Sequence, residues 1–215
     1  IEAVVERQLY MLGYRNAKAN FGRVVVDGDW TDVARLNMFL RSGERVLVCL
    51  ATFPAQTFDE LFEGVRAIDW HNYLTSDARV TVITKTVNSV LFAHNAIQSV
   101  GKKAIVAAVE PHFGAWREGG AEYVVELALR DNVVSVNLDT TGVGLHKRGY
   151  RPQTYTAPLK ETTAAALIDL SVWNPDKMFT DIFCGSGTLC IEAALKALKI
   201  APGLHRNFAY RNWAC

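Results

Sequence analysis

Residues 178–198 read MFTDIFCGSGTLCIEAALKAL, and this stretch contains the pattern that decides the fold. A short apolar and aromatic run ends at residues 181–183, two glycines follow at Gly185 and Gly187, and apolar residues then recur at helical spacing as far as Leu198. Glycines let a backbone approach a ligand without a Cβ atom in the way, and the N–H groups at the start of the next helix point at that ligand. The pattern therefore predicts a strand, a glycine loop and a helix at a nucleotide-type site.

The residues that follow the loop argue against two common nucleotide sites. A Walker-type phosphate loop needs Gly-Lys-Ser/Thr, whereas Gly187 is followed by Thr188 and Leu189. A dinucleotide fingerprint needs a third glycine where this chain has Cys190, and it needs an acidic residue about 20 residues further on. His-Arg-Asn occupies that region at residues 205–207. NAD is therefore a weaker alternative.

Residues 181–188, D-I-F-C-G-S-G-T, resemble the D-P-F-C-G-S-G-T signature of Rossmann-like S-adenosylmethionine (SAM) methyltransferases that act on nucleic acid. In that family the loop wraps the methionine and ribose parts of the cofactor. Ile182 stands where those enzymes usually have proline, which is one departure from the family pattern. An ordinary glycine-containing turn without a ligand is the alternative. The resemblance implies SAM contacts by Asp181, Phe183, Cys184, Gly185, Ser186, Gly187 and Thr188.

The composition is that of an ordinary globular protein with balanced charge. Of 215 residues, 50% are hydrophobic, which is enough for a sizeable core, and 23 Lys and Arg face 22 Asp and Glu. No global basic field points to nucleic acid, so any such site must be local. Residues 140–160 and the chain after Glu192 each contain four cations and no acid.

The cysteines support neither a disulfide framework nor a metal site, because they form no C-x-x-C pair and lack histidines at zinc spacing. No apolar stretch is long enough to span a membrane, and no signal peptide is visible. We therefore expect a cytoplasmic protein without a metal. The chain begins with Ile1 rather than methionine, from which we expect a natural start further upstream.

The first 52 residues predict an αβαβ order. Apolar residues fall at helical spacing in residues 1–12, a strand is expected at 23–26, a helix at 31–40 and a second strand at 45–51. A ferredoxin-like β-α-β-β-α-β unit would have one more strand before Ile1, and its absence again suggests a trimmed N-terminus.

A second α/β unit is expected over residues 53–139. Thr57 and Glu60 form a capping-box pattern that opens a helix, and a strand follows at 78–86. Residues 91–109 predict a helix that is interrupted or bent at Gly101. Residues 123–130 and 133–138 alternate as in a hairpin that turns at residues 131–132.

Residues 139–151 combine three glycines, a histidine, three cations and a tyrosine, which suits phosphate contacts and base stacking. A solvated linker is the alternative. The chain also resembles the THUMP-domain RNA guanine-N2 methyltransferases in the order of four motifs. These are G-L-H-K-R-G-Y-R at 144–151, A-P-L-K-E-T at 157–162, the glycine loop and I-A-P-G-L at 200–204. The similarity is closest to the bacterial group acting on 23S ribosomal RNA, and residues 67–70 and 101–105 resemble its THUMP part.

The resemblance implies an α/β (α+β) fold in three parts. These are a ferredoxin-like subdomain at 1–52, a THUMP RNA-binding domain at 53–151 and the start of a Rossmann-like methyltransferase domain at 152–215. It also implies that Pro158 and Lys160 lie over the cofactor, although Lys160 could equally be an exposed helix residue. The candidate RNA contacts are Lys85, Lys102, Lys103, His146, Lys147, Arg148, Tyr150 and Arg151, with solvated surface residues as the alternative.

One family motif is not found in this chain. An Asn/Asp-Pro-Pro-aromatic motif would hold the target amine, but the one Asn-Pro pair, Asn174-Pro175, is followed by Asp176 and predicts a turn. We therefore expect the front part of a longer enzyme that methylates guanine in 23S ribosomal RNA, inactive as this piece and with no catalytic residue to name. The alternatives are a non-catalytic RNA-binding protein with a decayed cofactor loop and a transfer-RNA guanine-N2 methyltransferase.

Overall fold

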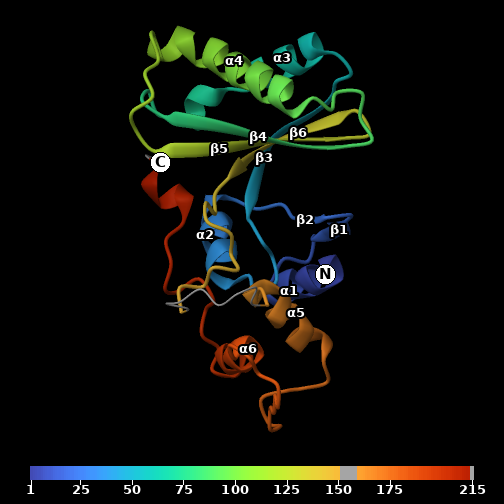
Figure 1. Ribbon diagram of the computed structural model, residues 1–215. Helices are drawn as coiled ribbons and strands as arrows, with labels where there is room; N and C mark the ends of the chain where they lie inside the picture. The colour runs from blue at the N-terminus through green and yellow to red at the C-terminus, as the bar shows by residue number, and fades with distance from the viewer. Residues whose placement is uncertain (151–158, 214–215) are drawn as a thin grey trace. The chain divides into compact units, whose positions relative to one another are not determined.

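The computed structural model describes residues 1–150 and 159–213 and shows two compact units (Figure 1). Unit 1 comprises residues 1–46 and 143–207, and unit 2 comprises residues 47–142 and the chain from Phe208 onward. No described helix is both long enough and apolar enough to cross a membrane. The elements are α1 Glu2–Met11, β1 Lys18–Asn20, β2 Arg23–Val25, α2 Trp30–Phe39, β3 Leu47–Pro54, α3 Phe58–Arg66, β4 Arg79–Val87, α4 His94–Phe113, β5 Glu122–Arg130, β6 Val133–Asp139, α5 Glu161–Leu170 and α6 Thr188–Ala197, with 3-10 helices at Trp70–Asn72 and Ala209–Asn212.

The N-terminal part of unit 1 confirms the two predicted helices and the strand at 23–26. The structure adds β1, a three-residue strand that pairs antiparallel with β2 and that the sequence did not reveal. Helix α2 begins one residue earlier than expected because Asp29 caps it. The Asp29 carboxylate accepts from the Asp32 N–H at 3.0 Å, and the Asp32 carboxylate accepts from the Asp29 N–H at 3.0 Å.

The strand predicted at 45–51 exists as β3, but it does not pair with β2. It pairs antiparallel with β6, at the edge of the four-stranded sheet of unit 2, whose order is β3-β6-β5-β4. In that sheet β4 and β5 are parallel and the other neighbours are antiparallel. Helices α3 and α4 pack against each other on one face of the sheet (Figure 1).

The predicted features of unit 2 are confirmed with one exception. Thr57 and Glu60 form the expected capping box at the start of α3, with backbone-to-side-chain distances of 3.1 and 3.2 Å. The hairpin between β5 and β6 turns at Asp131 and Asn132, whose φ angles of 50° and 63° suit a type I′ turn.

The exception is the bend predicted at Gly101, which is wrong. Helix α4 runs without interruption from His94 to Phe113, and Gly101 is buried inside it. A Cβ atom at this position would lie 2.5 Å from Leu127 Cδ1 on β5. The glycine therefore allows close helix-to-sheet packing rather than a bend.

The strand predicted before the glycine loop is also wrong. Residues 178–181 have no regular secondary structure, turns follow at 182–183 and 185–186, and none of the strands in the described chain pairs with this stretch. The helix after the loop is confirmed as α6. Helix α5 begins at Glu161 with Lys160 as its N-cap residue, whereas Pro158, an expected cofactor contact, and Arg151, an expected RNA contact, lie outside the described residues.

Candidate functional site

The glycine loop is a compact turn that ends at the first residue of α6. The Asp181 carboxylate accepts from the Phe183 N–H at 3.2 Å, and the Gly187 N–H donates to the Cys184 carbonyl at 2.7 Å. Gly185 and Gly187 have φ angles of 52° and 71°, which strain any residue with a side chain. A Cβ atom at Gly185 would meet no described atom within 4 Å. The loop conformation therefore depends on glycine, and open space lies beside it.

The start of α6 offers hydrogen-bond donors to that space. Gly187 is the N-cap residue, and no side chain among the described residues caps this helix. The first N–H groups of a helix have no partner within the helix, and its dipole makes this end partly positive. Ser186 Oγ and Thr188 Oγ1 lie 3.1 Å apart beside the same turn. A carboxylate or hydroxyl group of a small ligand fits such a donor set.

The loop also exposes apolar side chains. Phe183 is 90% exposed, and Met178 and Ile182 are similarly open. Cys184 is an exposed free thiol, whereas Cys190, inside α6, is half-buried. Exposed apolar groups next to open glycine backbone can cover the apolar part of a ligand or a neighbouring chain segment.

Lys160 meets an anion from the protein itself. Its Nζ lies 3.9 Å from Glu44 Oε1, and the same carboxylate contacts His146 Nδ1 at 2.5 Å and Thr162 Oγ1 at 3.3 Å. The predicted cofactor contact Lys160 and the predicted RNA contact His146 are therefore brought together around Glu44. Because the Lys160 side chain is 61% exposed, its weak pairing leaves it accessible to a ligand.

Arg148 has a different environment from the one predicted for an RNA contact. Its side chain is 2% exposed, and its Nε lies 3.3 Å from Glu192 Oε1 on α6. The guanidinium also donates to the carbonyl of Leu145 at 2.9 Å and to that of Arg41. Tyr150, another predicted RNA contact, donates its hydroxyl to Glu192 Oε1 at 3.1 Å. Since Arg148 is buried and paired, it cannot meet a phosphate in this conformation.

Lys147 is the exposed cation of the same segment. Its backbone carbonyl accepts from Arg206 Nη1 at 3.1 Å, and Arg206 also donates to the carbonyls of Gly144, at 2.7 Å, and Val143. Burial lowers the pKa of Arg206 below its usual value, and the nearby charge of Arg148 lowers it further. Residues 143–150, which we call the basic segment, are thus fixed through their backbone while Lys147 points to solvent.

Arg41 ties the other end of α6 to the N-terminal part of unit 1. Its Nη2 donates to the carbonyls of Ile200 at 2.6 Å and Leu195 at 3.3 Å. Burial lowers the pKa of Arg41, and the Glu192 carboxylate acts in the opposite direction. The guanidinium therefore binds one carbonyl in the last turn of the helix and one just beyond the helix end.

Asp169 on α5 is the centre of a second polar cluster in unit 1. Its carboxylate accepts from Lys196 Nζ on α6 at 2.6 Å and from Gln8 Nε2 on α1 at 2.5 Å. Gln8 Nε2 also donates to Ser42 Oγ at 2.8 Å, and Arg7 donates to the Asp169 carbonyl. Three helices are therefore joined by directional contacts around a side chain that is nearly buried.

Sequence reasoning did not identify Arg41, Glu192 or Arg206 as functional. One signal was available for Glu192, because it is the one acidic residue in a helix that is otherwise mostly apolar. Its partners Arg148 and Tyr150 lie more than 40 residues away in the chain, a distance that no local pattern bridges.

The predicted lysines of unit 2 are partly neutralised. Lys85 Nζ lies 2.6 Å from the buried Glu126 carboxylate, and Lys102 Nζ lies 2.8 Å from Glu118 Oε1. The hydrogen bond from Lys102 lowers the pKa of Glu118. Lys103 is exposed.

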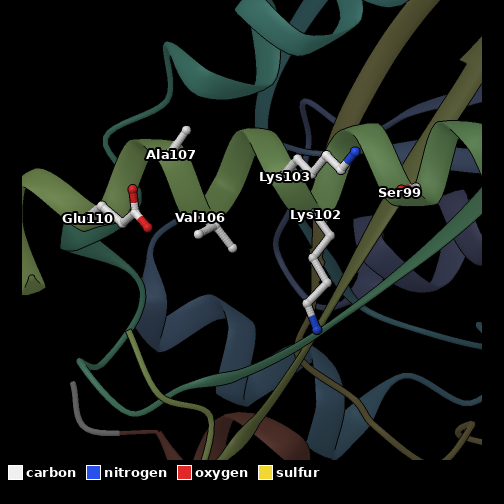
Figure 2. A pocket seen from close by; sticks show the side chains of 6 residues that line it. All are labelled: Ser99, Lys102, Lys103, Val106, Ala107 and Glu110. Atoms are coloured by element: carbon white, nitrogen blue, oxygen red, sulfur yellow. The ribbon is translucent and has the colours of Figure 1, made fainter. Parts of the chain in front are cut away.

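An open hollow of about 360 Å³ lies along α4, and the two adjacent lysines Lys102 and Lys103 form part of its lining. Figure 2 shows that Lys102 and Lys103 point in different directions from the helix, and that the carboxylate of Glu110 lies at the other end of the row. Mixed charge and divergent side chains give no defined phosphate site. The hollow is lined by Ser99, Lys102, Lys103, Val106, Ala107 and Glu110.

Within residues 1–150 and 159–213, no group of three histidine, cysteine or acidic side chains is arranged to hold a metal ion.

Three domain-family models match the chain in order. The RlmL ferredoxin-like domain matches residues 1–47, the THUMP domain residues 55–139, and the RMKL-like methyltransferase domain residues 148–214.

Individual proteins resemble the chain over nearly its whole length. The putative RNA methyltransferase YpsC of Bacillus subtilis (strain 168) is 45% identical over 217 residues, which cover 99% of this chain and 56% of that protein. Ribosomal RNA large subunit methyltransferase K/L of Marinomonas sp. (strain MWYL1) is 29% identical over 230 residues, 99% of this chain and 30% of that protein. The crystal structure of SMU.472, a putative methyltransferase complexed with SAH, matches with a TM-score of 0.92 at 44% identity, covering 99% of this chain and 57% of that one. The chain spans about half the length, or less, of the curated relatives named here.

Proposed function

Because the chain belongs to the THUMP-containing RNA methyltransferases of the RlmK/L type, we propose that the full-length protein transfers a methyl group from SAM to RNA. We propose further that the target is the exocyclic N2 amine of a guanine in 23S ribosomal RNA, and that the protein acts in the cytoplasm. The division into parts at 1–52, 53–151 and 152–215 belongs to the same proposal.

The observation that carries the proposal is the glycine loop at the start of α6. Both glycines adopt φ angles that favour glycine, and a side chain at Gly185 would project into open space. The donors at the start of α6 suit the carboxylate of the methionine part of SAM, and the exposed Phe183 suits an apolar part of the cofactor. Bound SAM would supply the electrophilic methyl group. The proposed contacts are Pro158, Lys160, Asp181, Phe183, Cys184, Gly185, Ser186, Gly187 and Thr188.

For RNA, the proposal relies on exposed cations. Lys147 offers its charge from a backbone that Arg206 holds in place. Lys85, Lys102 and Lys103 in the THUMP-matched region can add weaker contacts, since two of them are paired with carboxylates. Methyl transfer to an amine requires alignment of the two reactants above all, and it needs an acceptor for the amine proton. The residues described here contribute the alignment, by holding cofactor and RNA.

The test compares two glycine substitutions in the full-length protein. Gly187→Val should abolish binding of S-adenosylhomocysteine (SAH) in calorimetry, because Gly187 has φ 71° at the start of α6. Gly114→Val is the control for backbone strain away from the loop, since Gly114 also has φ 71°, although with ψ −149° instead of 16°, in unit 2 at the end of α4, with no neighbouring atom within 4 Å of its Cβ position. Equal SAH binding by the Gly187→Val and wild-type proteins would contradict the proposal.

The substrate is tested separately. Labelled methyl transfer from SAM to 23S ribosomal RNA, followed by mass spectrometry of the nucleosides, should yield N2-methylguanosine. If the product forms only with transfer RNA, the substrate is transfer RNA and not 23S ribosomal RNA. RNA binding without any methyl transfer would favour the non-catalytic alternative.

A further inference from the structure

The carboxylate of Glu192 is buried in the second turn of α6 and faces the basic segment. Its side chain is 0% exposed, and a single oxygen, Oε1, receives both Arg148 Nε at 3.3 Å and the Tyr150 hydroxyl at 3.1 Å. The other oxygen, Oε2, has no hydrogen-bond partner among the described residues. One helical side chain therefore holds two residues of one segment.

Packing alone does not require a charge at this position. A buried ion pair loses much of its attraction to the cost of removing both groups from water, and apolar residues of similar size often stabilise a fold equally well. What a carboxylate adds is direction, because its oxygen must lie where the guanidinium and the phenol can reach it. Directional contacts of this kind fix the relative position of two elements.

We infer that Glu192 is a positioning residue that fixes the glycine loop relative to the basic segment. Glu192 follows Gly187 by five residues in the same helix, which is about 7.5 Å along the axis at 1.5 Å per residue. A rigid helix transmits a shift at Glu192 directly to its N-terminus. This inference rests on the proposed function and assigns Arg148 and Tyr150 to alignment of the site instead of RNA contact.

The remaining contacts of the basic segment and α6 agree with this role. Arg206 holds the backbone of Val143, Gly144 and Lys147, and Arg41 holds the last carbonyls of α6. The segment that presents Lys147 to RNA and the helix that presents its N–H groups to the cofactor are thus both held in place, and Arg41 contributes to both because its carbonyl accepts from Arg148. The Glu192 contacts join the segment and the helix directly.

The first test is Tyr150→Phe in the full-length protein, because it removes one hydroxyl and keeps the ring. A hydrogen bond to a charged group is worth about a tenfold change in an equilibrium constant, so SAH affinity should fall by about tenfold. Amide hydrogen exchange in residues 184–190 should become faster in the absence of ligand. The salt dependence of RNA binding should not change, since no phosphate contact is lost.

Two further variants keep the result interpretable. Glu192→Gln keeps the size of the side chain and one acceptor oxygen and loses the charge, so its changes in SAH affinity and exchange should have the same direction and be smaller. Thr57→Ala removes the cap of α3 in unit 2 and controls for a general loss of stability, so its SAH affinity and its exchange in residues 184–190 should equal those of the wild type.

Two results would count against the inference in different ways. If wild-type protein binds SAH and Tyr150→Phe binds it equally well with unchanged exchange in residues 184–190, the positioning role is wrong while the proposed function stands. If the wild type binds no SAH, the proposed function fails and the inference fails with it. A lower RNA affinity of Tyr150→Phe at an unchanged salt slope, with SAH affinity and exchange unaltered, would restore Tyr150 as an RNA contact, because its hydroxyl carries no charge.

Discussion

The two units of the chain are stabilised by different kinds of interior. Unit 2 has an apolar core in which Leu61, Ile97, Ile105 and Leu127 are fully buried between the helices and the sheet. Unit 1 buries, besides apolar side chains such as Leu9 and Leu36, ionic and hydrogen-bonded groups, among them the pair of Arg148 with Glu192 and the cluster around Asp169. Apolar contact is non-directional and tolerates small shifts, whereas buried charges hold only one arrangement. The relative positions of the elements are therefore fixed most strictly in unit 1, which contains the candidate cofactor loop.

The strongest test of this contrast replaces the buried pair in unit 1. Glu192→Ala leaves Arg148 buried without its carboxylate and should lower the free energy of unfolding by about 3–5 kcal/mol, measured by urea denaturation. The double variant Arg148→Met with Glu192→Leu should recover most of that loss, because apolar side chains then fill the same space.

Recovery of stability should not bring recovery of SAH binding in the double variant. If the double variant is as unstable as Glu192→Ala, the ion pair contributes stability that apolar side chains cannot replace. The buried charges of unit 1 would then stabilise the fold as the apolar core of unit 2 does, and the proposed contrast between the units would fail.

The matching test in unit 2 is Gly101→Ala. Its Cβ atom would lie 2.5 Å from Leu127 Cδ1, so the buried Leu127 side chain or α4 must shift, at a cost of about 1–3 kcal/mol, measured by the same denaturation. Gly119→Ala is the control, because a Cβ atom there meets nothing within 4 Å. No difference between these two variants would show that the core of unit 2 adapts more easily than its packing indicates.

A smaller effect is expected from Lys147→Ala, which removes an exposed charge and no packing. Affinity for ribosomal RNA should fall, and the slope of log affinity against log salt concentration should decrease in size by about 0.7–0.9, as for one lost phosphate contact. Lys18→Ala on β1, also exposed, serves as a comparison of equal charge. An unchanged slope for Lys147→Ala would identify the basic segment as a structural linker.

The smallest effect concerns Glu118 in unit 2. The hydrogen bond from Lys102 holds the pKa of Glu118 below its usual value of 4.5, so folding favours the charged form. The stabilisation is therefore present above that usual value and is lost as the pH falls through the lowered pKa. Wild type and Glu118→Gln should differ by about 0.2–1 kcal/mol at pH 7 and by less at pH 3, compared by urea denaturation. A difference that grows on acidification would contradict the assignment of the pair.

Local patterns predicted most helices and the hairpin because their signals lie within a few residues. The cap at Thr57, the turn at Asp131 and the start of α6 after Gly187 are examples. The strand before the glycine loop was predicted wrongly, because strand identity depends on hydrogen bonds to a neighbour that local sequence does not reveal. For the same reason the strand expected at 45–51 was assigned to the first 52 residues, whereas as β3 it pairs with β6 of the second sheet.

The sequence indicated which residues in the candidate site have special chemistry, but it did not indicate which other residues they contact. The glycines of the loop adopt the special backbone angles that such a loop requires. Arg148 was selected for its charge among neighbouring cations, yet the partner that determines its role is 44 residues further along the chain. Charge can be read from sequence, whereas burial and pairing depend on the fold.

The path of the chain affects how this protein can be divided. The backbone passes from one unit to the other three times, near residues 46, 142 and 207. Trp213, at the far end, stacks on Tyr123 of β5 with ring centroids 4.7 Å apart and donates to the Glu122 carbonyl at 3.1 Å. A fragment limited to the THUMP-matched residues 55–139 would lack this indole and also strand β3. Limited proteolysis at one crossing would leave two covalent connections intact, so neither unit can be released by a single cut.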